Sequence, residues 1–164
     1  MANYVYTIFL DAGHGGSDPG AVYKGRQEKD DTLALTLAVG EILESYGFRV
    51  IYSRTEDIYD SPYQKAAKAN ASGADIFISI HRNSSPYPNQ YSGVESLVFN
   101  EWLPAGTKAT NINRQLEEIG YKNLGGNARP NLVVLRRTDM PAVLGEVGFI
   151  NNDQDNALLD AQFD

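Results

Sequence analysis

Cysteine is absent from the sequence, and histidine occurs only twice among 164 residues. Without cysteine the chain can form no disulfide, no thiolate metal ligand and no thiol nucleophile, so any metal site must use imidazole and carboxylate groups. Basic residues are also few, since 14 lysines and arginines stand against 21 aspartates and glutamates, for a formal net charge of -7. This acidic balance argues against nucleic acid as a partner, because phosphates favour a basic face.

Two kinds of apolar segment are missing as well. No run approaches the roughly 20 apolar residues that cross a bilayer, so no membrane partner is expected. The chain enters the apolar segment Val5–Leu10 almost at once, which leaves no room for the parts of a secretory signal peptide. If the protein acts outside a cell, we expect release by lysis, a phage origin, or a leader that this chain does not carry.

Apolar strands alternate with amphipathic helices along the chain. Ile76–Ile80 is a short, almost wholly apolar run, typical of a strand covered on both faces. We therefore predict one domain over residues 1–164, with an α/β fold, a mostly parallel central sheet of about six strands, and helices on both faces. The strands are expected at 4–10, 48–53, 76–80, 94–99, 132–135 and 142–147, the helices at 31–46, 61–72 and 107–119, and a turn at Gly125–Gly126.

Three polar residues stand just beyond the ends of apolar strands: His14, His81 and Glu146. In open α/β sheets, ligands bind beyond the carboxyl ends of the strands, so these side chains are expected to meet at one rim. Taken singly, each has an ordinary structural explanation. A histidine in a glycine-rich turn is usually a surface residue, and a glutamate after a strand is usually solvated or caps a helix. The prediction of a site therefore depends on the combination.

The glycine-rich stretch 13–20 follows a strand and precedes a helix, as a nucleotide-binding loop does. It lacks the Gly-Lys-Ser/Thr ending of a P-loop, and Asp18 stands where the dinucleotide fingerprint needs its third glycine. We expect these glycines instead to allow a tight backbone path around His14 and to leave room for a bulky substrate.

Five groups of residues occur in an order that resembles one enzyme family. They are Asp11–Gly16 with Asp18 and Gly20, Glu28–Asp30 at the start of a helix, Ser79–Ser84, Leu135–Arg137 with Met140–Leu144, and Glu146–Asn152. Together they cover essentially the whole chain and resemble the zinc-dependent N-acetylmuramoyl-L-alanine amidases. The resemblance implies a catalytic domain that acts on the cell wall. The bond cut would be the amide between N-acetylmuramic acid and the L-alanine of the stem peptide in peptidoglycan.

By position, the resemblance implies that His14, Glu28 and His81 bind one zinc ion and that Glu146 is the catalytic carboxylate. The chemistry agrees, because two imidazoles and one carboxylate are a usual ligand set of a catalytic zinc and leave a fourth position open. Glu146 would then take a proton from water and later deliver it to the leaving amine.

Two residues beside His81 are candidate substrate contacts. Asn83 either contacts the substrate, orients a metal ligand, or caps the turn after its strand. Arg82 stands where members of the family often carry a small residue, so we expect it to make the groove wall narrower and more positive. Residues 156–159 resemble only the beginning of the family's C-terminal helix. Either this helix is short, or the domain is part of a longer protein with a separate cell-wall-binding domain.

Two other functions stay open on the sequence. The same zinc ligand set serves peptidases and deacetylases, so the substrate could instead be a peptide or an N-acetyl group. The other alternative is a catalytically silent module that binds the cell wall or a partner protein. A silent module has no chemical reason to keep both histidines and both glutamates, which favours an enzyme.

Overall fold

The computed structural model describes residues 4–101 and 104–163. The central strands are β1 (Thr7–Ala12), β4 (Arg49–Tyr52), β5 (Ile76–Asn83), β6 (Val94–Val98), β7 (Asn123–Ala128) and β8 (Ala142–Phe149), and β2 (Val22–Tyr23) pairs with β3 (Arg26–Gln27) in a separate hairpin. The helices are α1 (Glu28–Ser45), α2 (Pro62–Ser72), α3 (Pro104–Glu118), α4 (Val133–Arg136) and α5 (Asp153–Phe163).

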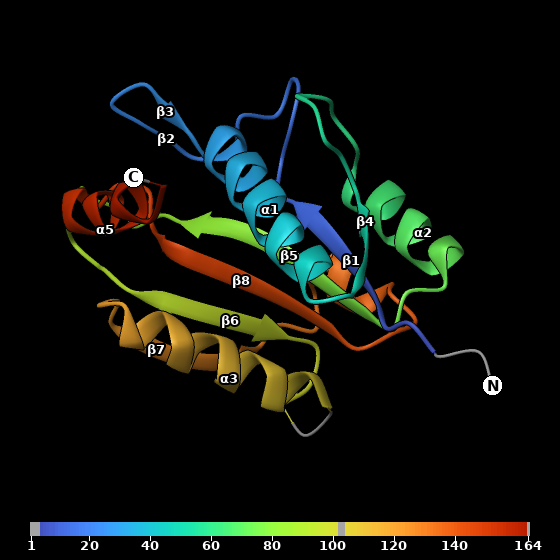
Figure 1. The fold of residues 1–164 in the computed structure, drawn as a ribbon. Helices are drawn as coiled ribbons and strands as arrows, with labels where there is room; N and C mark the ends of the chain where they lie inside the picture. The colour runs from blue at the N-terminus through green and yellow to red at the C-terminus, as the bar shows by residue number, and fades with distance from the viewer. Residues whose placement is uncertain (1–3, 102–103, 164) are drawn as a thin grey trace.

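The six central strands form one sheet in the order β4-β1-β5-β8-β6-β7 (Figure 1). Strands β4, β1, β5 and β8 run parallel to one another. Strand β6 pairs antiparallel with β8 and parallel with β7, so these two strands run in the opposite direction. The prediction of a mostly parallel sheet of about six strands is confirmed.

Neighbouring residues of a buried strand point to opposite faces, so an apolar strand places hydrophobic side chains on both faces of the sheet. Helices cover both faces. On one face, Phe9 and Phe77 pack with residues of α2 and α4. On the other face, Ile8 and Leu10 pack with residues of α1, and α3 covers Val143 further along the sheet. Figure 1 shows α1 lying across β1 and β5, with α3 beside β6 and β7.

Two predictions near the β7 edge are wrong. Residues 132–135 were expected to form a strand, but Val133–Arg136 form α4. Val134 and Leu135 are buried in the core cluster beside α2, so tertiary packing overrides the strand preference of branched residues. Gly125–Gly126 lie inside β7 and not in a turn. Gly125 has a φ of 86° where the β6–β7 register shifts, as expected for the extra residue of a bulge.

The C-terminal helix α5 spans 11 residues, of which the sequence indicated only 156–159. It is tied to the sheet by Asp155, whose carboxylate accepts the backbone N–H groups of Gly93 and Phe149 at 2.9 and 2.8 Å. Leu159, one helical turn further on, is 2% exposed and packs inward. Neither α5 nor any other helix within the described ranges is long and apolar enough to cross a membrane.

Candidate metal centre and active site

The three predicted metal ligands lie together at one rim of the sheet. His14 is in the loop after β1, Glu28 is the first residue of α1, and His81 lies near the end of β5. One ligand atom from each lies within 4.8 Å of the other two. His14 Nε2 is 3.0 Å from Glu28 Oε2, and His81 Nδ1 is 3.0 Å from Glu28 Oε1. The carboxylate therefore stands between two imidazoles, and the cluster could hold one metal ion.

Backbone donors fix the carboxylate of Glu28. The N–H of Ala21 donates to Oε2 at 2.9 Å, and the N–H of Arg82 donates to Oε1 at 3.0 Å. Burial by itself raises the pKa of Glu28, but the hydrogen bonds with His14 and His81 outweigh it and hold that pKa well below the usual range. Because Glu28 is only 4% exposed, its negative charge requires a cationic partner close by.

Asp18 sets the orientation of the His14 ring. Its Oδ2 lies 2.8 Å from His14 Nδ1, so the opposite nitrogen faces Glu28. Partial burial lowers the pKa of His14, but the hydrogen bonds with Glu28 and Asp18 raise it above its ordinary value. A carboxylate behind a ligating imidazole commonly fixes its tautomer and direction. Asp18 was not predicted to have this role, although its place four residues after His14 could have indicated it.

Two glycines allow the ligand side chains to approach one another. A Cβ on Gly13 would lie 2.5 Å from the His81 ring, and a Cβ on Gly20 would lie 2.6 Å from both Glu28 Oε2 and the His14 ring. The tight backbone path around His14 is confirmed, since His14 itself has a φ of 61°. The space beside Gly13 and Gly20 was expected to hold substrate, but it is filled by the side chains of His14, Glu28 and His81.

Two buried cations hold the backbone of the His14 loop. Arg54 donates to the carbonyl oxygens of Gly13 and Lys29 at 3.0 and 2.9 Å. Lys65, on α2, donates to the carbonyl oxygen of Ala12 at 2.7 Å. Both side chains are less than 5% exposed. The loop is thereby fixed against α1 on one side and α2 on the other, which positions one metal ligand without contacting it.

Glu146 lies beside the metal cluster on the neighbouring strand. In β8 it is the direct partner of His81 in β5, so both side chains leave the same face of the sheet. Its Oε2 atom is buried and has no hydrogen-bond partner among the described residues. Burial raises the pKa of Glu146 to about 7, an effect that His81 opposes and Glu28 reinforces. A carboxylate with a pKa near neutrality can both accept and donate a proton.

Asn83 lies on the same face of β5 as His81, two residues further along. Its Oδ1 accepts the backbone N–H of Ser84 at 2.9 Å, so it does cap the turn after the strand. Its Nδ2 also donates to Glu95 Oε2 at 3.3 Å, toward the β6 side of the rim. Asn83 is therefore part of a polar group next to the active site.

Arg82 is placed differently from the prediction. Its side chain has no exposed surface, forms an ion pair with Asp31 of α1, and donates to Asn156 Oδ1 of α5 at 2.6 Å. The alternation of side chains in β5 sends Arg82 to the face opposite His81. The expectation that Arg82 narrows the groove and makes it more positive is thus wrong, and its guanidinium instead joins helices behind the sheet.

A cavity of about 290 Å³ opens beside the metal cluster. His14 and His81 form part of its lining, so a ligand bound there reaches both imidazoles. The side opposite the histidines is mainly apolar and comes from α4 and the segment before it. The lining residues are Asp11, His14, Asp18, Asp60, Pro62, Lys65, His81, Asn131, Leu132, Val133, Val134 and Leu144.

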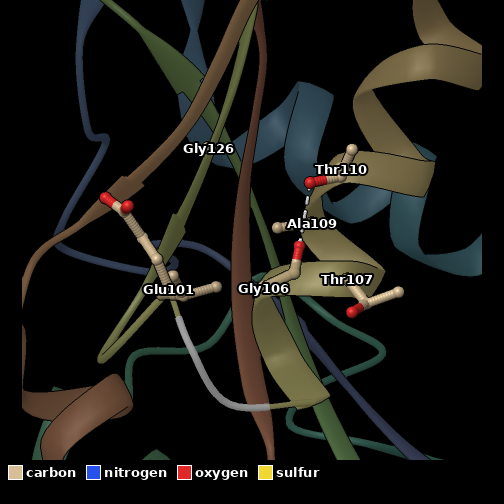
Figure 2. A pocket seen from close by; sticks show the side chains of 7 residues that line it. Glu101, Gly106, Thr107, Ala109, Thr110 and Gly126 are labelled. Carbon is tan, nitrogen blue, oxygen red and sulfur yellow. Dashed lines mark hydrogen bonds between the residues drawn. The ribbon is translucent and has the colours of Figure 1, made fainter.

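A second cavity, of about 260 Å³, lies between α3 and the β6–β7 edge. Figure 2 shows Glu101 on one side of it and Thr107 and Thr110 of α3 on the other. Neither histidine lines this cavity, and Glu101 already accepts the backbone N–H of Ala128 at 3.1 Å. The first cavity, by contrast, is lined by both histidines of the cluster that could hold a metal ion.

The site brings together two imidazoles and one carboxylate that could hold a metal ion, which is a ligand set used by a class of metal-dependent hydrolases. Comparison with known proteins gives the family. Residues 8–164 match the sequence profile of the family described as N-acetylmuramoyl-L-alanine amidase, and the chain belongs to this family.

Two curated relatives show the extent of the similarity. The sporulation-specific N-acetylmuramoyl-L-alanine amidase of Bacillus subtilis (strain 168) is 40% identical over 152 residues, which cover 90% of this chain and 58% of that protein. The endolysin of Bacillus phage SPP1 is 36% identical over 157 residues, which cover 93% of this chain and 58% of that protein. The chain thus spans somewhat more than half the length of these relatives.

Solved structures agree with the family assignment. The N-acetylmuramoyl-L-alanine amidase from Clostridium difficile 630 superposes with a TM-score of 0.88 at 33% identity, covering 95% of this chain and 86% of that chain. The catalytic domain of CwlV, from Bacillus (Paenibacillus) polymyxa var. colistinus, gives a TM-score of 0.88 at 32% identity, covering 97% of this chain and 89% of that chain. The α/β fold is therefore that of amidase catalytic domains.

Proposed function

We propose that residues 1–164 are a catalytic domain that hydrolyses the amide bond between N-acetylmuramic acid and L-alanine in peptidoglycan, with zinc as the metal. The observation that carries the proposal is the placement of Glu146, whose Oε2 atom is buried, directly opposite His81 and next to a cluster that could hold a metal ion. Membership of the amidase family supports the choice of bond. Peptidoglycan is the proposed partner, and the cell wall is the proposed place of action.

The donor set suits zinc. It combines two imidazole nitrogens with one carboxylate, and the chain contains no cysteine that would favour a closed structural site. Both histidines also line the cavity, so an ion that they held would lie next to the space where substrate would bind. The chemistry supplied by a bound zinc ion is Lewis acidity, which polarises a carbonyl group and makes water more acidic.

Glu146 supplies the proton transfers in this proposal. Its carboxylate accepts a proton from the attacking water, and the resulting carboxylic acid then donates that proton to the leaving amine of L-alanine. A pKa of about 7 suits both steps near neutral pH. Glu28 cannot take over this role, because its backbone and imidazole contacts keep it ionised. Asp18 keeps His14 turned toward the metal position throughout.

The relatives' additional length is where a separate wall-binding domain would lie in a longer protein, since this chain covers 58% of each of the two described above. Such a domain would raise the local concentration of substrate without changing the chemistry at the metal centre. The proposal for this chain therefore concerns the hydrolytic step, which its own residues can perform.

Digestion of purified cell walls tests the proposal. The zinc-loaded protein should release new N-terminal L-alanine and no new reducing sugar ends. New reducing ends in place of N-terminal alanine would assign the activity to a glycosidase and overturn the proposal. Cleavage of N-acetyl groups or of simple peptides with no release from walls would favour the deacetylase or peptidase alternatives. No turnover of any substrate would favour a binding module.

A further inference from the structure

A polar group borders Glu146 on the side away from the metal ligands. Glu95 in β6 is the direct antiparallel partner of Glu146 in β8, so its side chain leaves the same face of the sheet. Asn127 Nδ2 donates to Glu95 Oε1 at 2.7 Å, and Asn83 Nδ2 donates to Oε2 at 3.3 Å. We use the name Glu95 cluster for Asn83, Glu95, Asn127 and Arg129.

Arg129 gives this cluster an accessible positive charge. Its Nη2 lies 3.8 Å from Glu95 Oε1, its Nη1 donates to the carbonyl oxygen of Ala128 at 3.1 Å, and its side chain is 54% exposed. The Glu95 side chain is only 17% exposed, and its carboxylate already accepts two amide donors. It therefore acts as a counter-charge that directs the guanidinium, whose remaining N–H groups can bind a second carboxylate in a bidentate manner.

The order of the strands gives the cluster its place along a bound substrate. Strands β5, β8 and β6 are neighbours in the sheet (Figure 1). Their registers place His81, Glu146 and Glu95 in one row across it. If the scissile carbonyl lies at the metal ligands, the amine that receives the proton lies toward Glu146. The chain beyond that amine then continues over β6. With strands about 4.8 Å apart and about 3.5 Å per peptide residue, the second residue reaches the Glu95 cluster.

The charged side chains on the two sides of the metal ligands also favour a stem peptide that runs over β6. The cavity on the other side of the metal ligands is lined by the carboxylates of Asp18 and Asp60, and Lys65 there is buried and paired with Asp11. The glycan is uncharged near the scissile bond, whereas the stem peptide carries carboxylates. Asp60 is itself paired with Lys68, and Asp18 with His14. Because Lys65 is engaged by Asp11, the first side offers no accessible lysine to an anionic peptide, whereas the exposed guanidinium of Arg129 on the second side attracts it.

On these grounds, and resting on the proposed function, we propose that the Glu95 cluster is the subsite for the stem peptide. The residue after L-alanine in that peptide is a D-glutamate linked through its γ-carboxyl group, which leaves its α-carboxylate free or amidated. Arg129 binds the free α-carboxylate, and Glu95 with its two asparagines holds Arg129 in position. The cluster thus selects substrates with a carboxylate, and not a carboxamide, at this position.

The test compares two preparations of one peptidoglycan, with a free or an amidated α-carboxyl group at the second stem residue. The zinc-loaded wild type should show a kcat/KM for release of N-terminal L-alanine about tenfold higher on the free form, as expected for a charge-assisted hydrogen bond. Arg129→Gln should abolish the preference and change the rate on the amidated form less than about twofold. Arg129→Lys should retain part of the preference, because it keeps the charge.

Arg114→Gln is the matched control, because Arg114 is an exposed arginine of α3 paired with Glu118. This variant removes the same charge and should keep the full preference. Wild type that cleaves both preparations equally, or Arg129→Gln that loses rate equally on both, would overturn the inference while the proposed function stands. Wild type that releases no N-terminal alanine from either preparation would overturn the proposed function and the inference with it.

Discussion

His81 and Glu146 are direct partners across the parallel strands β5 and β8. One provides an imidazole for the metal cluster, and the other provides a buried carboxylate with a pKa of about 7. Strand pairing fixes the separation of the two side chains, so the cluster that could hold a metal ion and the Glu146 carboxylate are held at a set distance. The proposed division of labour between binding the ion and moving the proton depends on this pairing.

Replacement of Glu146 by glutamine should slow catalysis strongly without loss of the metal. We expect Glu146→Gln to lower the rate of wall digestion by roughly 10²- to 10⁴-fold, because the amide cannot accept the proton from water. Zinc content, measured by metal analysis, should be unchanged. Glu118→Gln, an exposed change on α3, is the control and should leave the rate unaltered. Loss of zinc from Glu146→Gln would mean that Glu146 is itself a ligand.

The same substitution should stabilise the metal-free protein at high pH. The pKa of Glu146 rises from 4.5 to about 7 on folding, so its contribution to stability is fully present below pH 4.5 and is lost as pH rises through 7. Metal-free Glu146→Gln should therefore be more stable than wild type at pH 8 by about 3 kcal/mol, and similar to it at pH 4. Urea unfolding in the presence of a chelator measures both. Equal stability at pH 8 would show that the carboxyl group is not desolvated.

Zinc binding should release protons near neutral pH. Partial burial lowers the pKa of His14, but the hydrogen bonds with Glu28 and Asp18 raise it above its ordinary 6.5, so the metal must displace a proton there. The affinity for zinc should fall as pH is lowered through this pKa. Calorimetric titrations at pH 7 in two buffers with different ionisation enthalpies report the protons released. A binding enthalpy that is the same in both buffers would contradict the expectation.

A single methyl group at Gly13 should disturb the metal site. A Cβ there would lie 2.5 Å from the His81 ring, so Gly13→Ala must displace this ligand. We expect zinc affinity to fall by roughly 10- to 100-fold, as for loss of ligand orientation in other sites. Gly126→Ala in β7 is the control, since its nearest contact would be an ordinary 3.7 Å. If Gly13→Ala bound zinc as tightly as the control, the close approach of Gly13 and His81 would be unimportant.

Arg82 should matter for stability and not for metal binding. Arg82→Met removes one partner of the buried ion pair with Asp31, which keeps Arg26 at 2.8 Å, so we expect a loss of about 2 to 3 kcal/mol. The backbone N–H that supports Glu28 remains in this variant. Zinc content should therefore equal that of wild type, and denaturant unfolding should show the loss. If Arg82→Met instead changed the substrate preference and kept full stability, Arg82 would have to line the substrate groove.

His14, His81 and Glu146 could be singled out in the sequence because each follows an apolar strand that can be recognised by itself, whereas Glu28, at the start of a helix, was assigned only through the resemblance to the amidase family. The orientation of Arg82 was missed because β5 was expected to end at Ile80, whereas it continues to Asn83. Alternation along the longer strand places His81 and Asn83 on one face and Arg82 on the other. A strand end misplaced by three residues was enough to reverse the environment of one side chain.

The β7 edge could not be predicted from local preferences. The Val133–Arg136 segment has strand-forming residues, yet packing against α2 makes it a helix, and the glycine-containing segment 123–128 becomes the edge strand. This exchange also brings Asn127 and Arg129 next to Glu95, which lies about thirty residues earlier in the chain. Long-range pairing of this kind depends on the assembled sheet and has no local signature.

The most direct test of the central claim is a crystal structure of the zinc-loaded protein with data collected at the zinc absorption edge. We predict one anomalous peak about 2.0 to 2.2 Å from His14 Nε2, His81 Nδ1 and a carboxylate oxygen of Glu28, with Glu146 near the ion but not bound to it. A peak that includes Glu146 as a ligand, or that lies away from these three residues, would contradict the account.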